Sequence, residues 1–197
     1  MQRTRSRASV RQEEILHATV DLVYDKGLRA IRISDVAENM GVSPGLIIYH
    51  FRTKEELLAR AFRFASTTDL ARATNIAQVE TDPLKRIVSI LKWYTPSDQS
   101  RSWLLWIDGW SAGLWNPEIA EALAEVHANW KALLHEAILE AAEKGLTSKY
   151  DAQHTTTRLI IFADGLSVAE LTGPSTFTKA EAHDWIEEFV SAEFLLH

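Results

Sequence analysis

Tryptophans gather in one stretch of the chain, and a carboxylate lies among them. Five of the seven tryptophans fall between residues 93 and 115, and Trp103, Trp106 and Trp110 recur at steps of three and four residues. This spacing puts the three rings on one helix face, and Asp108 belongs to the same stretch. An aromatic surface beside a carboxylate suits a cationic or an aromatic ligand. The alternative is a packed core stripe, which is the more frequent outcome for this spacing.

The remaining reactive residue types form no catalytic or metal-binding pattern. The chain has no cysteine, no His-x-x-x-His pair, no Glu-x-x-His repeat, no Gly-x-Ser-x-Gly elbow and no P-loop. His127 and His135 stand near glutamates and are interpreted as solvated helix positions. We therefore expect no enzymatic activity, no catalytic residues, no metal and no cofactor.

Charge is distributed unevenly along the chain. The formal net charge is -6, but residues 1–53 hold eight Lys and Arg against six Asp and Glu, whereas residues 54–197 hold 13 basic and 21 acidic side chains. A polyanion is tolerated at the N-terminal end and repelled by the rest. The basic residues Arg3, Arg5 and Arg7 alone would indicate only a solvated tail.

The apolar content fits a soluble protein. Hydrophobic residues make up 46% of the 197 residues, which is ample for a core. The N-terminus lacks the apolar segment of a signal peptide, and the longest apolar runs, such as WLLWI and LIIFA, are too short to cross a bilayer. We expect a soluble, cytoplasmic protein with no membrane partner.

Helical periodicity runs through nearly the whole sequence, so we predict an all-α fold of about nine helices. A first helix should end at Gly27. Ser34 is expected to cap a short second helix, and Ser43 a third one with Pro44 at its first position. The later helices are expected from about residue 54 into the seventies and at about 83–95, 99–114, 117–144, 152–172 and 179–196. No alternating strand pattern is present.

The second and third expected helices, joined by a turn at Gly41, describe a helix-turn-helix, whose second helix enters the major groove of DNA. Val36 and Ala37 can face inward from the first of these helices, and Ile47 and Phe51 form an apolar i, i+4 pair on the other. The opposite face of the third helix carries Gly45, Ile48, Tyr49 and Arg52. This face could approach bases and phosphates.

The segment GVSPGLIIYHFRTKEELL, preceded by ILHATVDLVYDKGLRAIRISDVAENM, resembles the N-terminal DNA-binding domain of the TetR family of transcriptional repressors over residues 11–60. The resemblance implies a three-helix DNA-binding domain at 1–53. It also implies a larger effector-binding and dimerisation domain at 54–197. The expected partners are double-stranded operator DNA, a second copy of the chain and a small-molecule effector. The expected function is a ligand-responsive regulator, most often a repressor in this family.

The resemblance and the exposed helix face together assign residues to DNA binding. These are Ser34, Ser43, Pro44, Gly45, Leu46, Ile48, Tyr49, His50 and Lys54. Many relatives have Thr or Ala at the position of Leu46 and Tyr at that of Ile48. The third helix here therefore offers few polar side chains that could hydrogen-bond to bases. Two hypotheses would supply further DNA contacts. In the first, Ile48 contacts a thymine methyl group; in the second, the tail around Arg5 and Arg7 reaches the minor groove.

The C-terminal part, including WLLWIDGWSAGLWNPEIAEALAEVHANWKALLHEAI, resembles most the subgroup that contains the choline-responsive repressor of betaine synthesis. An effector pocket along the tryptophan stripe is therefore expected. Its candidate residues are Trp93, Trp103, Trp106, Asp108, Trp110 and Trp130. The last two helices are expected to form the dimer interface through Leu159, Phe162, Leu166, Trp185 and Phe189. The open alternative is a helical interaction or small-molecule-binding protein with a degenerate helix-turn-helix.

Overall fold

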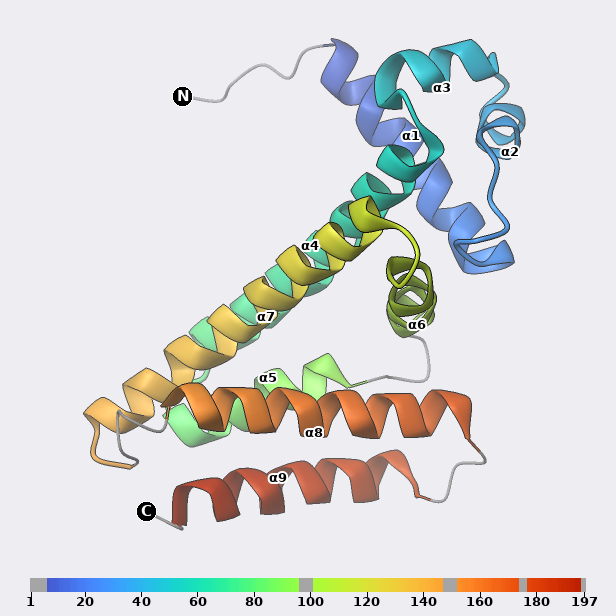
Figure 1. The fold of residues 1–197 in the computed structure, drawn as a ribbon. Helices are drawn as coiled ribbons and strands as arrows, with labels where there is room; N and C mark the ends of the chain where they lie inside the picture. The colour runs from blue at the N-terminus through green and yellow to red at the C-terminus, as the bar shows by residue number, and fades with distance from the viewer. Residues whose placement is uncertain (1–6, 96–100, 147–151, 174–176, 196–197) are drawn as a thin grey trace. The chain divides into compact units, whose positions relative to one another are not determined.

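The computed structural model describes residues 7–95, 101–146, 152–173 and 177–195, most of which are helical (Figure 1). The helices are α1 (Arg7–Lys26), α2 (Ile33–Asn39), α3 (Pro44–Phe51), α4 (Lys54–Val79), α5 (Pro83–Tyr94), α6 (Ser102–Gly113), α7 (Pro117–Glu143), α8 (Ala152–Thr172) and α9 (Lys179–Leu195). No strand occurs in the described residues. The predicted all-α fold and its helix order are confirmed, with bounds that differ by a few residues, as helix ends commonly do.

Local sequence explains where the helices begin. Pro83 starts α5, and the Asp82 carboxylate accepts hydrogen bonds from the Leu84 and Lys85 amides over 2.9 and 3.0 Å. The Lys85 amide is the largest of the influences that lower the pKa of Asp82, because it stabilises the ionised form. This capping separates α5 from the end of α4.

The predicted N-cap of α2 is wrong by two residues. The helix begins at Ile33, so Arg32 holds the N-cap position and Ser34 lies in the first turn. The Arg32 amide donates to Asp35 Oδ2 over 2.9 Å, which closes that turn without a serine cap. Ser43 does occupy the N-cap position of α3, as predicted, although its hydroxyl makes no capping hydrogen bond there.

Packing divides the chain into two compact units. Unit 1 comprises Met1–Thr67 and Leu104–Val126, and unit 2 comprises Thr68–Trp103 and His127–His197. The predicted domain boundary at 53/54 remains a prediction; packing instead groups the first half of α4 and most of α6 with α1–α3. Sequence alone could not indicate this, because the segment at 104–126 is far along the chain from α1–α3.

Unit 1 has a core made from α1–α4 and α6. Ile15, Val36, Ile47, Phe51 and Phe62 are all buried in it. Two close-packed helix pairs, α1 with α2 and α2 with α3, hold the helix-turn-helix on this core. Because Ile47 and Phe51 of α3 are buried in this core, the opposite face of α3 is the one left exposed.

Unit 2 is organised around α5, α8 and α9. Helix α5 packs against both α8 and α9, which lie side by side (Figure 1). Its core includes Ile87, Ile90, Leu134, Ile138 and Ile186, all of which are buried. Within the described residues, no helix is both long enough and apolar enough to cross a membrane.

Candidate DNA interface and effector site

The helix-turn-helix forms as its apolar pattern predicts. Val36 and Ala37 of α2 are buried, and so are Ile47 and Phe51 of α3. Between the helices the Val42 amide donates to the Ala37 carbonyl over 2.9 Å, which fixes the turn. The two helices are therefore held at a defined angle by apolar contacts and one backbone bond.

The opposite face of α3 is open to solvent. Ile48 is 47% exposed and Tyr49 is 80% exposed, and Gly45 is exposed beside them. Tyr49 meets the His50 ring edge-on at a centroid distance of 5.1 Å. A large, exposed aromatic side chain on a short helix of this kind is free to contact another molecule.

The flanks of α3 supply further polar groups. Ser34, Ser43 and Pro44 are exposed, whereas Leu46 is partly buried. Lys54, at the start of α4, donates from Nζ to the Arg29 carbonyl over 3.2 Å. The positive end of α4 adds to the lysine charge, which favours a phosphate near this helix start. The basic tail at residues 1–6 lies outside the described residues, as does the side chain of Arg7.

The structure divides the six candidate effector residues between the units. Trp106, Asp108 and Trp110 belong to unit 1, and Trp93, Trp103 and Trp130 belong to unit 2. Helical spacing alone had put the tryptophans of α6 on one face. Helix α6 begins in one unit and continues in the other, so its ring contacts divide between two cores.

In unit 1, Trp106 is buried and packs edge-on against Phe62 at 5.1 Å, with Trp110 at 6.0 Å. Asp108 has a partner that sequence analysis missed: its Oδ2 accepts a hydrogen bond from the Leu28 amide over 2.8 Å. This bond lies at the turn after α1. The Asp108 carboxylate thus ties α6 to the turn that follows the first helix of the DNA-binding segment.

In unit 2, three aromatic residues form what we call the aromatic cluster: Tyr94, Trp103 and Trp130. The Tyr94 ring meets Trp103 at 5.4 Å and Trp130 at 4.9 Å, both edge-on, and all three residues are buried. The Trp103 indole donates from Nε1 to the Tyr94 carbonyl over 2.6 Å. Trp93, in contrast, is partly exposed and donates to the Asp69 carbonyl over 3.2 Å.

A carboxylate from α8 adjoins the aromatic cluster. The Tyr94 hydroxyl donates to Asp164 Oδ1 over 2.6 Å, and His127 Nε2 lies 3.6 Å from Asp164 Oδ2. Burial, with the neighbouring Asp164 charge, raises the pKa of Tyr94 well above its usual value. Asp164 was missed by sequence analysis, although a lone carboxylate within the apolar run LIIFADGL was a usable signal.

The expectation that His127 and His135 are solvated is wrong. Both are only partly exposed, and His135 Nδ1 lies 3.0 Å from the Thr156 hydroxyl oxygen. His127 instead faces Asp164 at the aromatic cluster. The error arose because both histidines have glutamates as chain neighbours, while their actual partners come from α8.

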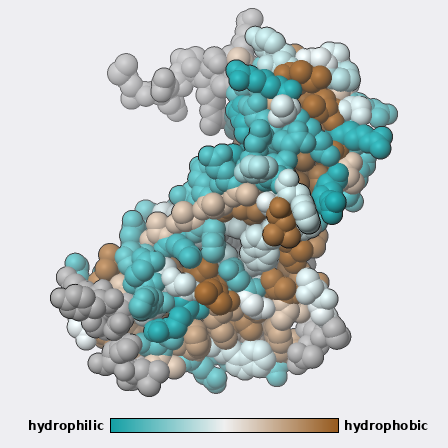
Figure 2. Space-filling model, in the orientation of Figure 1, coloured by the Kyte–Doolittle hydropathy of each residue, from teal (hydrophilic) through white to brown (hydrophobic). Residues whose placement is uncertain are grey.

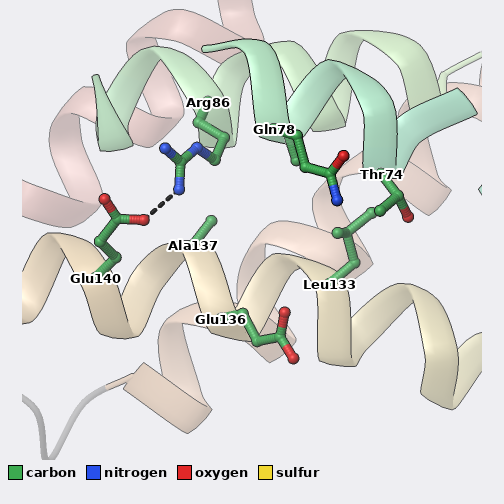
Figure 3. Close-up of a pocket in the computed structure, with 8 residues that line it drawn as sticks. Thr74, Gln78, Arg86, Leu133, Glu136, Ala137 and Glu140 are labelled. Atoms are coloured by element: carbon green, nitrogen blue, oxygen red, sulfur yellow. Dashed lines mark hydrogen bonds and ion pairs between the residues drawn. The ribbon is translucent and has the colours of Figure 1, made fainter. Parts of the chain in front are cut away.

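Unit 2 also contains an open pocket of about 240 Å³ between α4, α5 and α7 (Figure 3). Its floor is apolar, with Ala137 at the centre, and Arg86 and Glu140 form an ion pair at one end. The lining residues are Thr74, Ala77, Gln78, Arg86, Leu133, Glu136, Ala137 and Glu140. None of them is among the candidate effector residues. The pocket, with an apolar floor and charged residues at its edge, is an alternative to the aromatic cluster as an effector site.

The candidate dimer residues differ in exposure. Leu159 and Leu166 are buried within unit 2 and serve its own core. Phe162 stacks on Phe189 at 4.3 Å across α8 and α9, and both are partly exposed. Trp185 is more exposed. Of the five candidate dimer residues, Phe162, Phe189 and Trp185 are therefore the accessible ones, whereas Leu159 and Leu166 are not.

The structure adds one large apolar residue that sequence analysis did not select. Ile161, on α8, is 62% exposed. On the face drawn in Figure 2, hydrophobic residues appear as separate patches among hydrophilic ones. Contiguous apolar patches mark surfaces that meet another protein, whereas scattered exposed apolar residues are common on any protein surface. Among the described residues, no group of His, Cys, Asp or Glu could hold a metal ion.

Comparison with known proteins gives two family matches. Residues 15–61 match the bacterial regulatory proteins of the tetR family, and residues 83–195 match the C-terminal part of BetI-type transcriptional repressors. A BetI 1 regulator from Chromohalobacter salexigens is 26% identical over 187 residues, which cover 91% of this chain and 90% of that protein. The repressor KstR2 from Mycolicibacterium smegmatis is 26% identical over 87 residues, but this match covers only 44% of this chain and 42% of that protein.

Solved structures agree with these matches. A transcriptional regulator from Saccharomonospora viridis in complex with choline has a TM-score of 0.80 and 25% sequence identity, covering 93% of this chain and 96% of that one. A transcriptional regulator from Pseudomonas aeruginosa has a TM-score of 0.81 at 20% identity, covering 96% of this chain and 92% of that one. The latter likeness concerns the fold alone.

Proposed function

Because the chain belongs to the TetR family of bacterial regulatory proteins, with a BetI-type C-terminal region, we propose that it represses transcription as a homodimer released by a small cationic effector. DNA binding and transcriptional regulation follow from family membership. The symmetry of the operator, the dimer surface and the nature of the effector are what the proposal adds.

The DNA part of the proposal is carried by the exposed face of α3. Ile48 and Tyr49 project from a helix whose other side is fully buried, so they are free to enter the major groove without any loss of core packing. Ser34, Ser43 and Lys54 flank them with groups that bind phosphates. In a homodimer the two helices would reach half-sites about one helical turn apart, roughly 34 Å, or somewhat more.

The dimer part of the proposal concerns α8 and α9. In relatives of this family two helices pair with their counterparts in a four-helix bundle, and here Ile161 and Trp185 leave apolar surface exposed on α8 and α9. Gly165, exposed between turns of α8, allows close approach of a second helix. The buried Leu159 and Leu166 would support this surface from within.

The effector part of the proposal concerns the aromatic cluster. Three ring systems and the Asp164 carboxylate are the groups that bind a quaternary ammonium ion, through cation–π attraction and charge. A relative of similar fold is in complex with choline. Because all three rings are buried and in contact, a ligand can enter only if they separate. Only a ligand with higher affinity for this opened form would shift the population toward it.

Helix α4 is the proposed connection between effector and DNA. It begins at Lys54, beside the DNA-binding helix, and ends at Val79. Within it, the Asp69 carbonyl accepts a hydrogen bond from the Trp93 indole N–H. Separation of the rings in unit 2 would therefore act on a helix that starts at the DNA. The released form would be one whose two α3 helices have the wrong spacing.

The first test is selection of bound sequences from a random duplex library by the purified full chain at near-physiological salt. We expect a two-fold symmetric motif, bound with an affinity that falls steeply as salt rises because several phosphates are neutralised. The absence of any enriched motif, with choline removed, would contradict the DNA part of the proposal.

The second test adds choline to the selected complex. Choline is expected to release the wild-type protein, while Asp164→Asn should bind the duplex but respond weakly. The matched control is Glu136→Gln, which alters a carboxylate of the open pocket in the same unit. The reverse pattern, loss of response in Glu136→Gln alone, would assign the effector to the pocket instead.

A further inference from the structure

One polar atom of the aromatic cluster is unsatisfied. Trp130 is only 3% exposed, and its Nε1 is fully buried without a hydrogen-bond partner among the described residues. The other indole of the cluster, Trp103, donates to the Tyr94 carbonyl, and the Tyr94 hydroxyl donates to Asp164. The Trp103 indole and the Tyr94 hydroxyl thus each have a partner, whereas the Trp130 indole N–H has none among the described residues.

An unpaired buried donor is costly. Removal of an N–H from water without a replacement acceptor is unfavourable, which is why buried polar groups in folded proteins are nearly always paired. An indole nitrogen can donate but not accept, so only an acceptor atom can satisfy it. The position of this indole matters too, because its ring meets the Tyr94 ring edge-on at a centroid distance of 4.9 Å, and a cation is proposed to bind at Tyr94.

We propose that Trp130 Nε1 donates a hydrogen bond to an oxygen of the effector, so that the site selects cations that carry a hydroxyl, carbonyl or carboxylate oxygen close to the ammonium group. This inference rests on the proposed function of the aromatic cluster and makes it more specific. The rings and Asp164 bind the charge, and the indole N–H distinguishes an oxygenated cation from a plain alkylammonium ion. Such a site discriminates between the two ligands because the wrong one leaves the donor unpaired.

Two ligands of nearly equal shape separate these contributions. Choline and n-propyltrimethylammonium have the same trimethylammonium group, but the second replaces the hydroxyl by a methyl group. Isothermal titration of the full chain with each ligand should give about tenfold tighter binding of choline, as one additional hydrogen bond predicts. In Trp130→Phe the preference should fall to within about twofold, while the affinity for n-propyltrimethylammonium is retained.

The matched control is Trp103→Phe. It removes an indole from the same cluster, but one whose N–H already has a backbone partner. Both affinities should fall in this variant, and the preference for choline should remain about tenfold. Loss of the preference in Trp103→Phe to the same degree as in Trp130→Phe would overturn the proposal.

A second measurement needs no variant in the cluster. In the ¹⁵N spectrum of the indole groups, choline should shift the Trp130 proton downfield, and n-propyltrimethylammonium should not. If both cations bind equally well and neither shifts this proton, an internal water satisfies the donor and the inference is wrong, although the cationic effector stands. If neither cation binds the wild-type protein, the proposed effector class itself fails, and the inference fails with it.

Discussion

The Asp108 carboxylate accepts a hydrogen bond from the Leu28 amide over 2.8 Å, although the two residues are eighty positions apart in the chain. Leu28 is buried at the turn that follows α1, so this amide has little access to water as an alternative partner. The contact joins α6 to the helix on which the DNA-binding segment rests. It is the basis of the first two predictions.

Substitution of Asp108 should destabilise unit 1. Asp108→Ala leaves the Leu28 amide unpaired and is expected to lower the free energy of unfolding by about 1–3 kcal/mol, as measured by urea denaturation. Asp108→Asn keeps an acceptor oxygen and should lose less. Glu121→Ala, an exposed carboxylate on α7 in the same unit, is the control and should stay within about 0.5 kcal/mol of the wild type.

Gly27 should tolerate no side chain while Asp108 is present. Its φ is +79°, and an added Cβ would lie 2.9 Å from Asp108 Oδ2. Gly27→Ala should therefore cost more than the approximately 1–2 kcal/mol of left-handed strain alone. Gly41→Ala is the matched control, since its φ is +64° and nothing lies within 4 Å of the added atom. In an Asp108→Ala background, the two glycine substitutions should cost equal amounts; a persistent difference would point to another cause.

Lys54 is expected to bind a phosphate of the operator. Lys54→Ala should weaken binding to the selected duplex uniformly across sequences and lower the slope of log affinity against log salt by about 1. Fluorescence anisotropy over a salt series measures both quantities. Lys85→Ala, which removes an exposed lysine of α5 outside the helix-turn-helix, should leave the slope unchanged. Equal slopes for wild type and Lys54→Ala would exclude the phosphate contact.

Tyr94 should make stability depend on alkaline pH. Its raised pKa means that the folded state keeps the phenol proton above pH 10, the usual tyrosine value, whereas the unfolded state loses it. The stability from this group is thus complete below pH 10 and decreases by about 1.4 kcal/mol per pH unit above it. Urea unfolding between pH 9 and pH 11, values chosen to bracket the usual pKa of about 10, should give a smaller decrease for Tyr94→Phe.

The control for this pH series is Tyr49→Phe, which removes a hydroxyl from an exposed ring on α3. Its decrease above pH 10 should match that of the wild type. Parallel curves for wild type and Tyr94→Phe would mean that the phenol of Tyr94 titrates in the folded state as it does in the unfolded chain.

Ile161 is expected to lie in the dimer interface. Ile161→Arg places a charge on an exposed apolar position of α8 and should shift the protein toward monomers in light scattering, with little change in the helical circular dichroism signal. Asn129→Arg, an exposed site on α7 of the same unit, controls for the added charge and should remain dimeric. A monomeric wild type at micromolar concentration would defeat the dimer proposal itself.

Sequence periodicity predicted the faces of helices correctly and their distant partners poorly. In α3 the i, i+4 pair Ile47 and Phe51 identified the buried side, and the exposure of Tyr49 follows from its position on the other one. Asp108 could not be assigned in the same way. Its partner Leu28 is set by tertiary packing, and the tryptophans around Asp108 suggested a ligand instead.

The aromatic cluster illustrates the same limit. Trp103 and Trp130 were expected near a ligand from composition and resemblance, but Asp164 and His127 join them only because α5, α7 and α8 pack together. Helical spacing also grouped Trp103 with Trp106. Because α6 passes from one unit into the other after its second residue, neighbours on one helix face enter separate cores.

The unequal burial of the tryptophans gives the protein natural optical probes. Trp115, in unit 1, is 83% exposed, whereas Trp103 and Trp130 of unit 2 are shielded from solvent. Exposed indoles emit at longer wavelengths and are quenched by iodide, while shielded ones are not. Separation of the aromatic rings would thus be visible as a red shift of the iodide-resistant emission, and Trp115→Phe would remove the most exposed indole of unit 1 from the background. Opening of the cluster could be timed without an attached dye.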